Sequence, residues 1–122
     1  MTQSSANVWP TEIKLSQDKR TLTIAFDNGE TFALPAELLR VMSPSAEVQG
    51  HSAEQRVTVP GKRKVAIRDL RMIGNYAVQI VFDDGHDTGF YRWVYLHELG
   101  AREAEHWQAY EAELSAKGLV RG

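Results

Sequence analysis

The chain has 122 residues, 43% of them hydrophobic and 25% charged, and a formal net charge of −2, values typical of one globular domain. The slightly negative charge argues against a domain that binds nucleic acid over its whole surface. Because the chain contains no cysteine, disulfides, thiolate metal sites and cysteine nucleophiles are excluded. The N-terminus lacks a signal-peptide pattern and no segment is apolar enough to span a membrane, so we expect a cytoplasmic protein.

The first third of the chain is predicted to form a three-stranded meander and a short helix. Residues 1–8 are small and polar and are expected to be a disordered tail. Alternating apolar residues then predict three strands, around 13–15, 22–26 and 32–34. Pro35 suits the first turn of a helix, which we predict over residues 36–42.

The middle of the chain is less regular. Residues 43–64 are mostly polar, with one brief apolar alternation, and are expected to contain a short edge strand or to carry function. Alternation resumes at Val65 but changes parity near Arg68 and Asp69. This one-residue slip predicts a β-bulge.

A central hairpin follows. Residues 76–82 alternate as a strand with one strongly buried face, and Asp84-Gly85 predicts a type I′ turn, so residues 83–87 are expected at an exposed tip. The motif I-x-F-D-[ND]-G occurs at 24–29 and again at 80–85. Each copy leads into an apolar helix start, which indicates two similar halves, each a hairpin followed by a helix.

Two helices are predicted to complete the chain. The first covers about 92–99 and ends at Gly100, and the second covers about 101–117 and ends at Gly118, leaving residues 118–122 as a tail. The expected fold class is therefore α+β, a single small domain of about six antiparallel strands with two or three helices.

The last predicted helix is amphipathic. Its apolar face holds Trp107, Tyr110 and Leu114, which we expect to pack on the sheet or on a second subunit. Glu113 and Lys117 have the spacing of a favourable ion pair on the outer face.

The acidic turn is a candidate metal site. Carboxylates and imidazole are ordinary ligands of iron and zinc, and the set would be His86, Asp84 and Asp87 with His51 from the long loop. The alternative interpretation is a solvated hairpin turn, which aspartates favour. We expect the other two histidines, His97 and His106, to be helix-surface residues.

A basic run and an aromatic run are further candidates. Five cations lie within ten positions, at Lys62, Arg63, Lys64, Arg68 and Arg71. They would contact phosphates or an acidic partner, or they belong to a solvated edge strand protected against aggregation. The aromatics Tyr91, Trp93 and Tyr95 would stack on a ligand, but we expect at least two of them to be core residues.

No catalytic motif is present, because the sequence lacks G-x-S-x-G, H-E-x-x-H, G-x-G-x-x-G and a complete phosphate-binding loop. The iron-binding pattern of a histidine followed two residues later by Asp or Glu is also absent. We therefore expect a protein that is not an enzyme.

Several segments together resemble a known family. They are Leu34-Pro35-x-Glu37-Leu38-Leu39-Arg40, Ser43-Pro44-x-Ala46-Glu47, Gly50-His51, Val65-x-Ile67, Gly74-Asn75-Tyr76-Ala77 and Asp83-Asp84-Gly85-His86-x-Thr88-Gly89-x-Tyr91-x-Trp93-x-Tyr95-Leu96. Over residues 9–100 the chain resembles the small bacterial proteins of the DUF971 family, which is similar to the N-terminal domain of gamma-butyrobetaine hydroxylase. Related domains are fused to Mrp-type ATPases that handle iron–sulfur clusters.

The resemblance implies a structural zinc site that this chain has changed. In the hydroxylases, three cysteines after a Leu-Arg helix end and the histidine of an Asp-Gly-His turn hold the metal. The helix end matches at Arg40 and the histidine at His86, but the cysteine positions fall on Ser43, Ser45 and Val48. Since serine is a poor zinc ligand and valine is none, we expect the zinc to be absent. The hydroxylases' catalytic iron lies in a separate barrel domain, which this chain is too short to contain.

Our leading hypothesis is a non-catalytic accessory domain that binds a protein partner or forms a homodimer, in a context of iron or iron–sulfur cluster handling. Nucleic acid and membrane partners are not expected, and no cofactor is assigned. The candidate contact residues are His51, Arg40, Tyr91, Trp93, Lys62 and Arg63. The alternatives are a metal-binding protein using His86 and His51 with nearby aspartates, and weak phosphate or nucleic-acid binding through Lys62 to Arg71.

Overall fold

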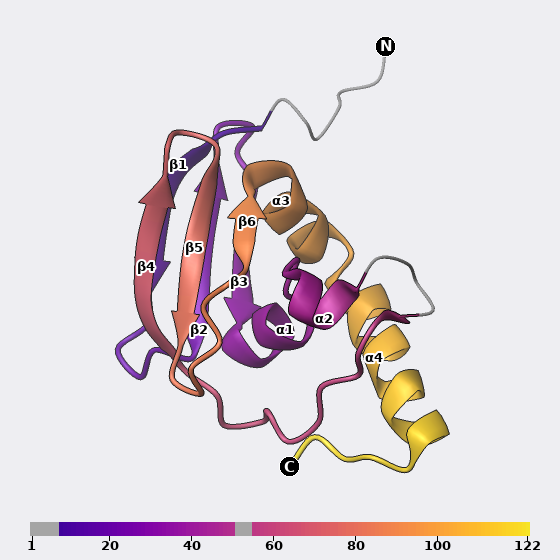
Figure 1. Ribbon diagram of the computed structural model, residues 1–122. Coiled ribbons are helices and arrows are strands. Elements are labelled where there is room, and N and C mark those ends of the chain that lie inside the picture. Colours follow the sequence, from indigo (N-terminus) through magenta and orange to yellow (C-terminus); the bar gives the residue numbers. More distant parts are fainter. Residues whose placement is uncertain (1–7, 51–54) are drawn as a thin grey trace.

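The computed structural model describes residues 8–50 and 55–122, which form two three-stranded antiparallel sheets and four helices (Figure 1). The first sheet contains β1 (Pro10–Leu15), β2 (Thr21–Phe26) and β3 (Thr31–Pro35), and the second contains β4 (Ile67–Ile73), β5 (Ala77–Phe82) and β6 (Phe90–Arg92). The helices are α1 (Ala36–Val41), α2 (Ala46–Gln49), α3 (Trp93–Ala101) and α4 (Glu103–Lys117). The α+β class and the six strands are confirmed. Four helices form rather than two or three, because the 43–64 segment contains a helical turn, α2.

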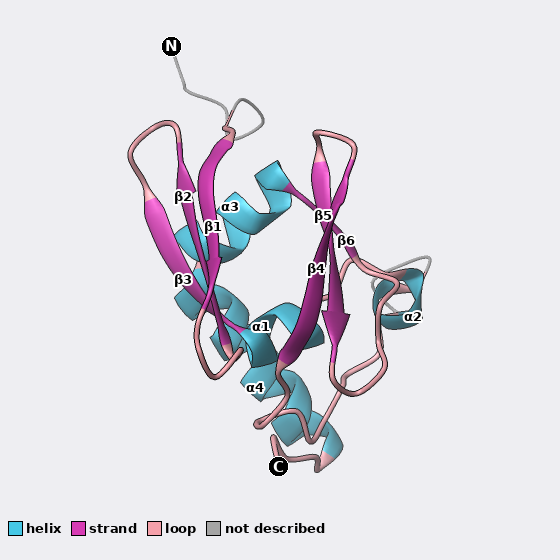
Figure 2. Ribbon diagram, turned by 90° about the vertical axis from the view of Figure 1, so that its left-hand side faces the viewer, coloured by secondary structure: helices cyan, strands magenta, loops and turns pink. Residues whose placement is uncertain are grey.

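The hydrophobic core lies between the two sheets, which stand face to face (Figure 2), and α3 lies at one side of the pair, next to β3 and β6 (Figure 1). Its centre comes from the middle strand of each sheet, where alternate side chains are at most 3% exposed: Leu22, Ile24 and Phe26 in β2, and Val78, Ile80 and Phe82 in β5. Burying each such side chain contributes roughly 1.5–3 kcal/mol. The period-2 pattern that predicted these strands therefore also identified the centre of the core.

The predicted similarity of the two halves is confirmed at their hairpin loops. In the first, Gly29 N–H donates to Phe26 O and Phe26 N–H to Glu30 O; in the second, Gly85 N–H donates to Phe82 O and Phe82 N–H to His86 O. Each half then passes directly from its third strand into a helix, α1 or α3.

The turn type differs from the expected type I′. A type I′ turn needs positive φ at both central residues, whereas Gly85 (φ 93°) has positive φ and Asp84 does not. Together with the hydrogen bond from Phe82 N–H to His86 O, this is the three-residue loop that ends in a glycine bulge. His86 follows this loop and is 6% exposed, whereas Asp83, Asp84 and Asp87 are exposed, so the predicted exposed tip is confirmed except at His86.

The predicted bulge in β4 is confirmed, because the pairing with β5 shifts register between Ile67 and Asp69. Strand β4 lies at the edge of its sheet, where bulges and charges hinder pairing with other chains. Arg68 and Arg71 are both exposed there, which supports the solvated-edge interpretation for this part of the basic run.

Gly100 does not end a helix as predicted, since α3 continues to Ala101. A Cβ atom at Gly100 would lie 2.3 Å from Cγ of Phe32. The glycine therefore allows α3 to approach β3 closely. Gly118, with φ of 65°, does end α4 as predicted.

The apolar face of α4 is buried within the chain. Tyr110 (0% exposed) and Leu114 (5%) form a second small cluster with Val41 of α1, with Trp107 packed against it. Glu113 does not turn to Lys117 as expected; its carboxylate accepts from Nε of Arg56 at 2.9 Å.

Both ends of the described chain make specific contacts. Val8, assigned to the tail from sequence, is 4% exposed and belongs to the main core. In the 118–122 segment, Val120 O accepts from Gly61 N–H and the Arg121 guanidinium makes two 2.8 Å bonds to the carboxylate of buried Glu37. The segment expected to be a tail thus closes against the 61–63 loop and α1 (Figure 1).

Candidate functional site

The carbonyls at the end of α1 are satisfied by side chains from distant parts of the chain. The hydroxyl of Tyr91 donates to Leu39 O and that of Tyr95 to Met42 O. Tyr91 is fully buried and Trp93 is 6% exposed, so these two aromatics are core residues, as expected for at least two of the three. Burial raises the pKa of Tyr95 to about 12, which keeps its hydroxyl protonated as a donor.

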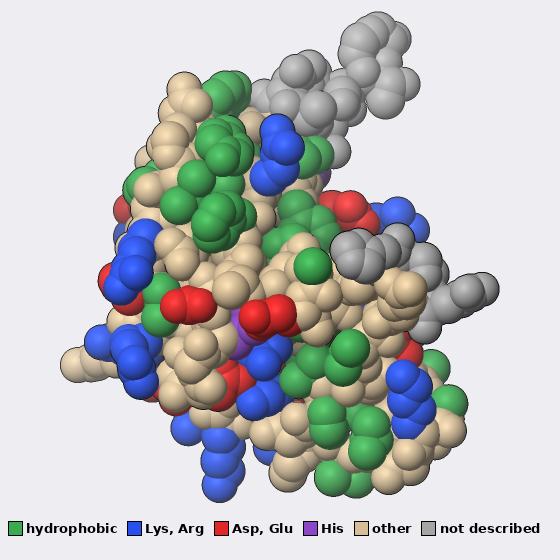
Figure 3. Space-filling view, viewed as in Figure 1, with side chains coloured by type: hydrophobic (Ala, Val, Ile, Leu, Met, Phe, Trp, Pro, Cys, Tyr) green, Lys and Arg blue, Asp and Glu red, His purple; other side chains and the backbone are tan. Residues whose placement is uncertain are grey.

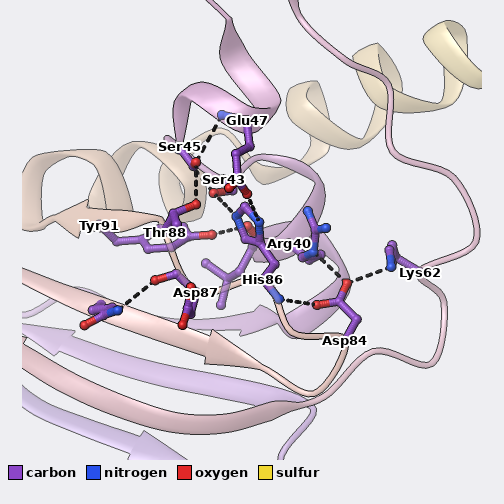
Figure 4. Close-up of polar contacts among 12 residues, drawn as sticks. Arg40, Ser43, Ser45, Glu47, Lys62, Asp84, His86, Asp87, Thr88 and Tyr91 are labelled. Atoms are coloured by element: carbon purple, nitrogen blue, oxygen red, sulfur yellow. Dashed lines mark hydrogen bonds and ion pairs between the residues drawn. The ribbon is translucent and has the colours of Figure 1, made fainter.

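Buried His86 lies at the centre of a polar cluster next to the second hairpin loop, in which Ser43 and Ser45 are buried and Glu47 is exposed (Figure 4). Its Nε2 is 2.8 Å from Oγ of Ser43, and its Nδ1 is 3.0 Å from Oε1 of Glu47. Ser43 follows α1 and Glu47 belongs to α2, so one imidazole joins the hairpin loop to both. The residue is 6% exposed, in contrast to the solvated tip expected from sequence.

The imidazole is neutral near pH 7. Burial lowers its pKa most, the nearby charge of Arg40 lowers it further, and Glu47 and Asp84 oppose the shift only in part. Because a carboxylate only accepts, we assign the ring proton to Nδ1, which donates to Glu47; Nε2 then accepts from the Ser43 hydroxyl.

Two further hydroxyls extend the cluster. Oγ of Ser45 lies 2.6 Å from Oγ1 of Thr88, and it accepts from the Glu47 N–H as the N-cap of α2. The Ser45 N–H in turn donates to Oγ of Ser43 at 3.2 Å. At Gly89 an added Cβ would lie 2.6 Å from Oγ of Ser43, so the loop can approach this closely only with glycine. We call Ser43, Ser45, Glu47, His86 and Thr88 the hydroxyl–imidazole cluster.

A charged group lies beside this cluster. Oδ2 of Asp84 is 2.8 Å from Nε of Arg40 and 2.7 Å from Nζ of Lys62, while Oδ1 accepts from the His86 N–H. Partial burial by itself raises the pKa of Asp84, but the hydrogen bonds from Lys62, the His86 backbone and Arg40 outweigh it and lower the pKa to about 2. Asp84 therefore remains ionised and neutralises part of the local positive charge.

The bonding order of Ser43, His86 and Glu47 matches that of a hydrolase relay. A nucleophile must reach its substrate, however, and Ser43 is 0% exposed. In this conformation the arrangement ties segments together and presents no hydroxyl to a ligand.

The candidate metal ligands are not directed to one point. The carboxylate of Asp84 faces Arg40 and Lys62, and both ring nitrogens of His86 are engaged. Asp87 is exposed, and its backbone carbonyl accepts from Nε2 of Gln79. His51 lies outside the described residues. Across 8–50 and 55–122, no group of three or more His, Cys, Asp or Glu residues is arranged to hold a metal ion.

The basic candidates serve several different contacts. Lys62 and Arg40 meet at Asp84, whereas Nε of Arg63 donates to Gly122 O at 3.0 Å. On the edge strand, Arg71 pairs with Asp69 and both remain exposed. The run at 62–71 therefore does not form one phosphate-sized cluster in the described structure.

The remaining histidines are more buried than expected. The His97 side chain is 13% exposed, packs in edge-to-face contact with the rings of Phe26 and Phe32, and contacts Glu30. The His106 side chain is 18% exposed beside Glu98. Both histidines lie on helices as expected, but Phe26 and Phe32 of the first sheet partly cover His97, and Nε2 of His106 is 3.5 Å from Oε2 of Glu98 on α3.

A second surface feature was not recognised from sequence. A pocket of about 200 Å³ is lined by Val8, Trp9, Tyr76, Arg92, Trp93 and Val94. Trp9 and Tyr76 are 49% and 46% exposed, and Phe90, which shares a face of β6 with Arg92, is 47% exposed. Hydrophobic side chains gather over this part of β5 and β6 in the space-filling view (Figure 3). The sequence did hold one indication of an exposed aromatic residue: Phe90 and Tyr91 are adjacent in a strand, and neighbours in a strand cannot both face the core.

The fold and the cluster define a small α+β domain in which a hairpin histidine is bonded to the loop between two short helices. The family model described as gamma-butyrobetaine hydroxylase-like, N-terminal, matches residues 13–97, and the chain belongs to this family. The resemblance inferred from the sequence is thus confirmed.

Solved structures similar to this chain include two NMR structures and one crystal structure. Two are described as NMR solution structures. The first is 47% identical to this chain with a TM-score of 0.81, and the match covers 99% of this chain and 90% of the other. The second is 43% identical with a TM-score of 0.79, and the match covers 93% of this chain and 90% of the other. The third is a crystal structure of a DUF971-family protein of unknown function from Acidithiobacillus ferrooxidans, 33% identical with a TM-score of 0.64 over 82% of this chain and 99% of the other. A comparison with curated proteins finds no match. Within the described residues, no helix has the length and apolar character needed to cross a bilayer.

Proposed function

We propose that the protein is a non-catalytic interaction domain that binds an extended segment of a partner protein. The contact surface is the aromatic patch, which we define as Trp9, Tyr76, Phe90 and Arg92 around the 200 Å³ pocket. The observation that carries the proposal is the exposure of two large aromatic side chains that line this pocket, Trp9 (49%) and Tyr76 (46%). A third, Phe90 (47%), lies on the same face of β6 as the pocket residue Arg92.

The composition of the patch supports a protein contact. Single exposed hydrophobic residues are common on proteins, but clusters mark interaction sites. Tryptophan, tyrosine and arginine are also the residues that most often dominate binding energy at protein interfaces. Here the guanidinium of Arg92 lies over the Tyr76 ring, 5.5 Å from its centre, which holds both side chains in place.

The size of the pocket favours a side chain over a metabolite. Small-molecule sites usually enclose about 300–1,000 Å³. A pocket of about 200 Å³ suits one large side chain of a partner. The guanidinium at its rim favours acidic residues next to that side chain. The resemblance to domains joined to larger enzymes points to a partner that handles iron or iron–sulfur clusters.

Site-specific photo-crosslinking tests this proposal in the cell. A benzophenone amino acid replaces Tyr76 or Phe90, and the matched control carries it at exposed Lys117 on α4. We expect one discrete crosslinked product from positions 76 and 90 and none from 117. A product of twice the chain mass would identify the partner as a second copy. Equal crosslinking at all three positions would contradict a specific patch.

A loss-of-contact variant completes the test. Trp9→Ser removes an aromatic side chain of the patch, and Val57→Ser changes a side chain of similar exposure (48%) elsewhere. We expect Trp9→Ser to reduce recovery of the crosslinked partner at least tenfold, with Val57→Ser close to wild type. Both proteins should retain the wild-type unfolding midpoint.

A further inference from the structure

We propose that the hydroxyl–imidazole cluster occupies the place of a structural metal and makes the fold of this domain independent of metal. The resemblance noted from the sequence implies a zinc site at Ser43, Ser45, Val48 and His86. The structure supplies independent observations on whether these four residues fit a metal.

The donor set does not fit zinc. Structural zinc sites use thiolate, imidazole or carboxylate ligands, and they bind the deprotonated form of each thiol. Ser43 and Ser45 offer neutral hydroxyls, and Val48, which is 2% exposed, offers only methyl groups. His86 alone among the four is an ordinary zinc ligand.

The geometry also differs from that of a shared ligand shell. Ligands of one tetrahedral zinc lie about 3.5 Å apart, given Zn–S and Zn–N distances of about 2.3 and 2.0 Å. Nε2 of His86 and Oγ of Ser43 are 2.8 Å apart, in direct hydrogen-bond contact. Oγ of Ser45 faces Thr88, so it belongs to a different hydrogen bond.

The polar atoms that a metal would otherwise organise are satisfied by one another. Ser43 bonds His86, Ser45 bonds Thr88, and Nδ1 of His86 bonds Glu47. Buried polar groups cost free energy unless they are paired, and here the pairs connect the α1–α2 loop to the second hairpin. These are the same two segments that a metal bound at positions 43, 45, 48 and 86 would hold together.

The first experiment uses the wild-type chain. The protein is purified from zinc-supplemented medium, its metal content is measured by mass spectrometry, and its melting temperature is recorded with EDTA and with added Zn²⁺. We expect less than one-tenth of an equivalent of zinc and the same melting temperature in both conditions. One equivalent of zinc, lost in His86→Ala but retained in His97→Ala, together with a lower melting temperature in EDTA, would overturn the proposal.

The second experiment restores the ligands. The triple variant Ser43→Cys, Ser45→Cys, Val48→Cys should bind one zinc per chain, and its melting temperature should rise with zinc and fall with EDTA. Adding His86→Ala should weaken zinc binding roughly tenfold or more. A folded triple variant that binds no zinc would show that the backbone at positions 43, 45, 48 and 86 is not arranged as a metal site, and it would overturn the proposal. If the triple variant does not fold without zinc, refolding on addition of zinc would support the proposal, and failure to refold would overturn it.

Discussion

Nε2 of His86 lies 2.8 Å from Oγ of Ser43, a residue 43 positions earlier in the chain. This contact joins the second half of the fold to the loop that follows the helix of the first half. Because the imidazole is buried and also bonded to Glu47, the contact depends on the protonation state of one ring.

The first prediction concerns the pH dependence of stability. The folded pKa of His86 is below the unfolded value of 6.5, so the unfolded chain binds more protons as the pH falls through that region. The His86 contribution is therefore fully present above about pH 6.5 and is progressively lost below it. Urea unfolding at about pH 7.5 and about pH 5.5 measures the loss, which should be smaller in His86→Gln than in wild type. An equal loss in both proteins would assign the dependence to other groups.

The second prediction concerns the charged group beside the cluster. Asp84→Asn leaves Arg40 and Lys62 without the carboxylate that they share. The Arg40 side chain is only 12% exposed and that of Lys62 only 24%. We expect a loss of about 1.5–3 kcal/mol in the free energy of unfolding. The matched control is Asp69→Asn, which breaks an exposed pair with Arg71 and should cost less than about 1 kcal/mol.

Asp84 also predicts an effect at low pH. Its folded pKa of about 2 is below the ordinary value of 3.8, so its contribution is present above 3.8 and is lost as the pH falls towards 2. The free energies of unfolding of wild type and Asp84→Asn, measured as the pH is lowered, should therefore converge towards pH 2. A constant difference between the two free energies of unfolding over this whole pH range would contradict the lowered pKa of Asp84.

The third prediction concerns Gly100. Replacement with Ala improves intrinsic helix propensity by about 1 kcal/mol but places Cβ against the Phe32 ring. We expect the clash to prevail, with a net loss of about 1–2 kcal/mol measured by urea unfolding. In the double variant Gly100→Ala, Phe32→Leu the smaller side chain should relieve part of the clash, so the stability loss should be less than the sum of the two single losses. A loss equal to that sum would exclude the contact as the cause.

The fourth prediction concerns the C-terminal segment. Arg121→Ala leaves the carboxylate of Glu37, which is 6% exposed, without its bidentate partner. We expect destabilisation of about 3 kcal/mol. Arg102→Ala, which breaks an exposed pair with Glu105, should change stability by less than about 1 kcal/mol. Similar losses in the two variants would show that the Arg121 pair is no more than a surface contact.

Local patterns predicted the strands, the positions of their turns and the bulge, because alternation and turn residues act over a few positions. Gly100 shows the limit of such patterns, since a glycine that ends a helix and one that admits a neighbouring ring look alike in sequence. The burial of His86 could not be predicted either, because it depends on a loop type set by φ at Asp84 and on Ser43, far away in the chain. The resemblance did single out positions 43, 45 and 86, which lie in one hydrogen-bonded cluster.

Each hairpin loop ends at a residue whose side chain contacts the other half of the fold. The residue that closes the first loop, Glu30, contacts His97 on the helix of the second half, and the residue that closes the second, His86, contacts Glu47 beyond the helix of the first. The first half thus supplies two carboxylates and the second half two imidazoles to the contacts between the halves. A chain cut between Pro60 and Gly61 should therefore yield two fragments that are unfolded alone and reassemble on mixing, as fragment complementation followed by circular dichroism would show.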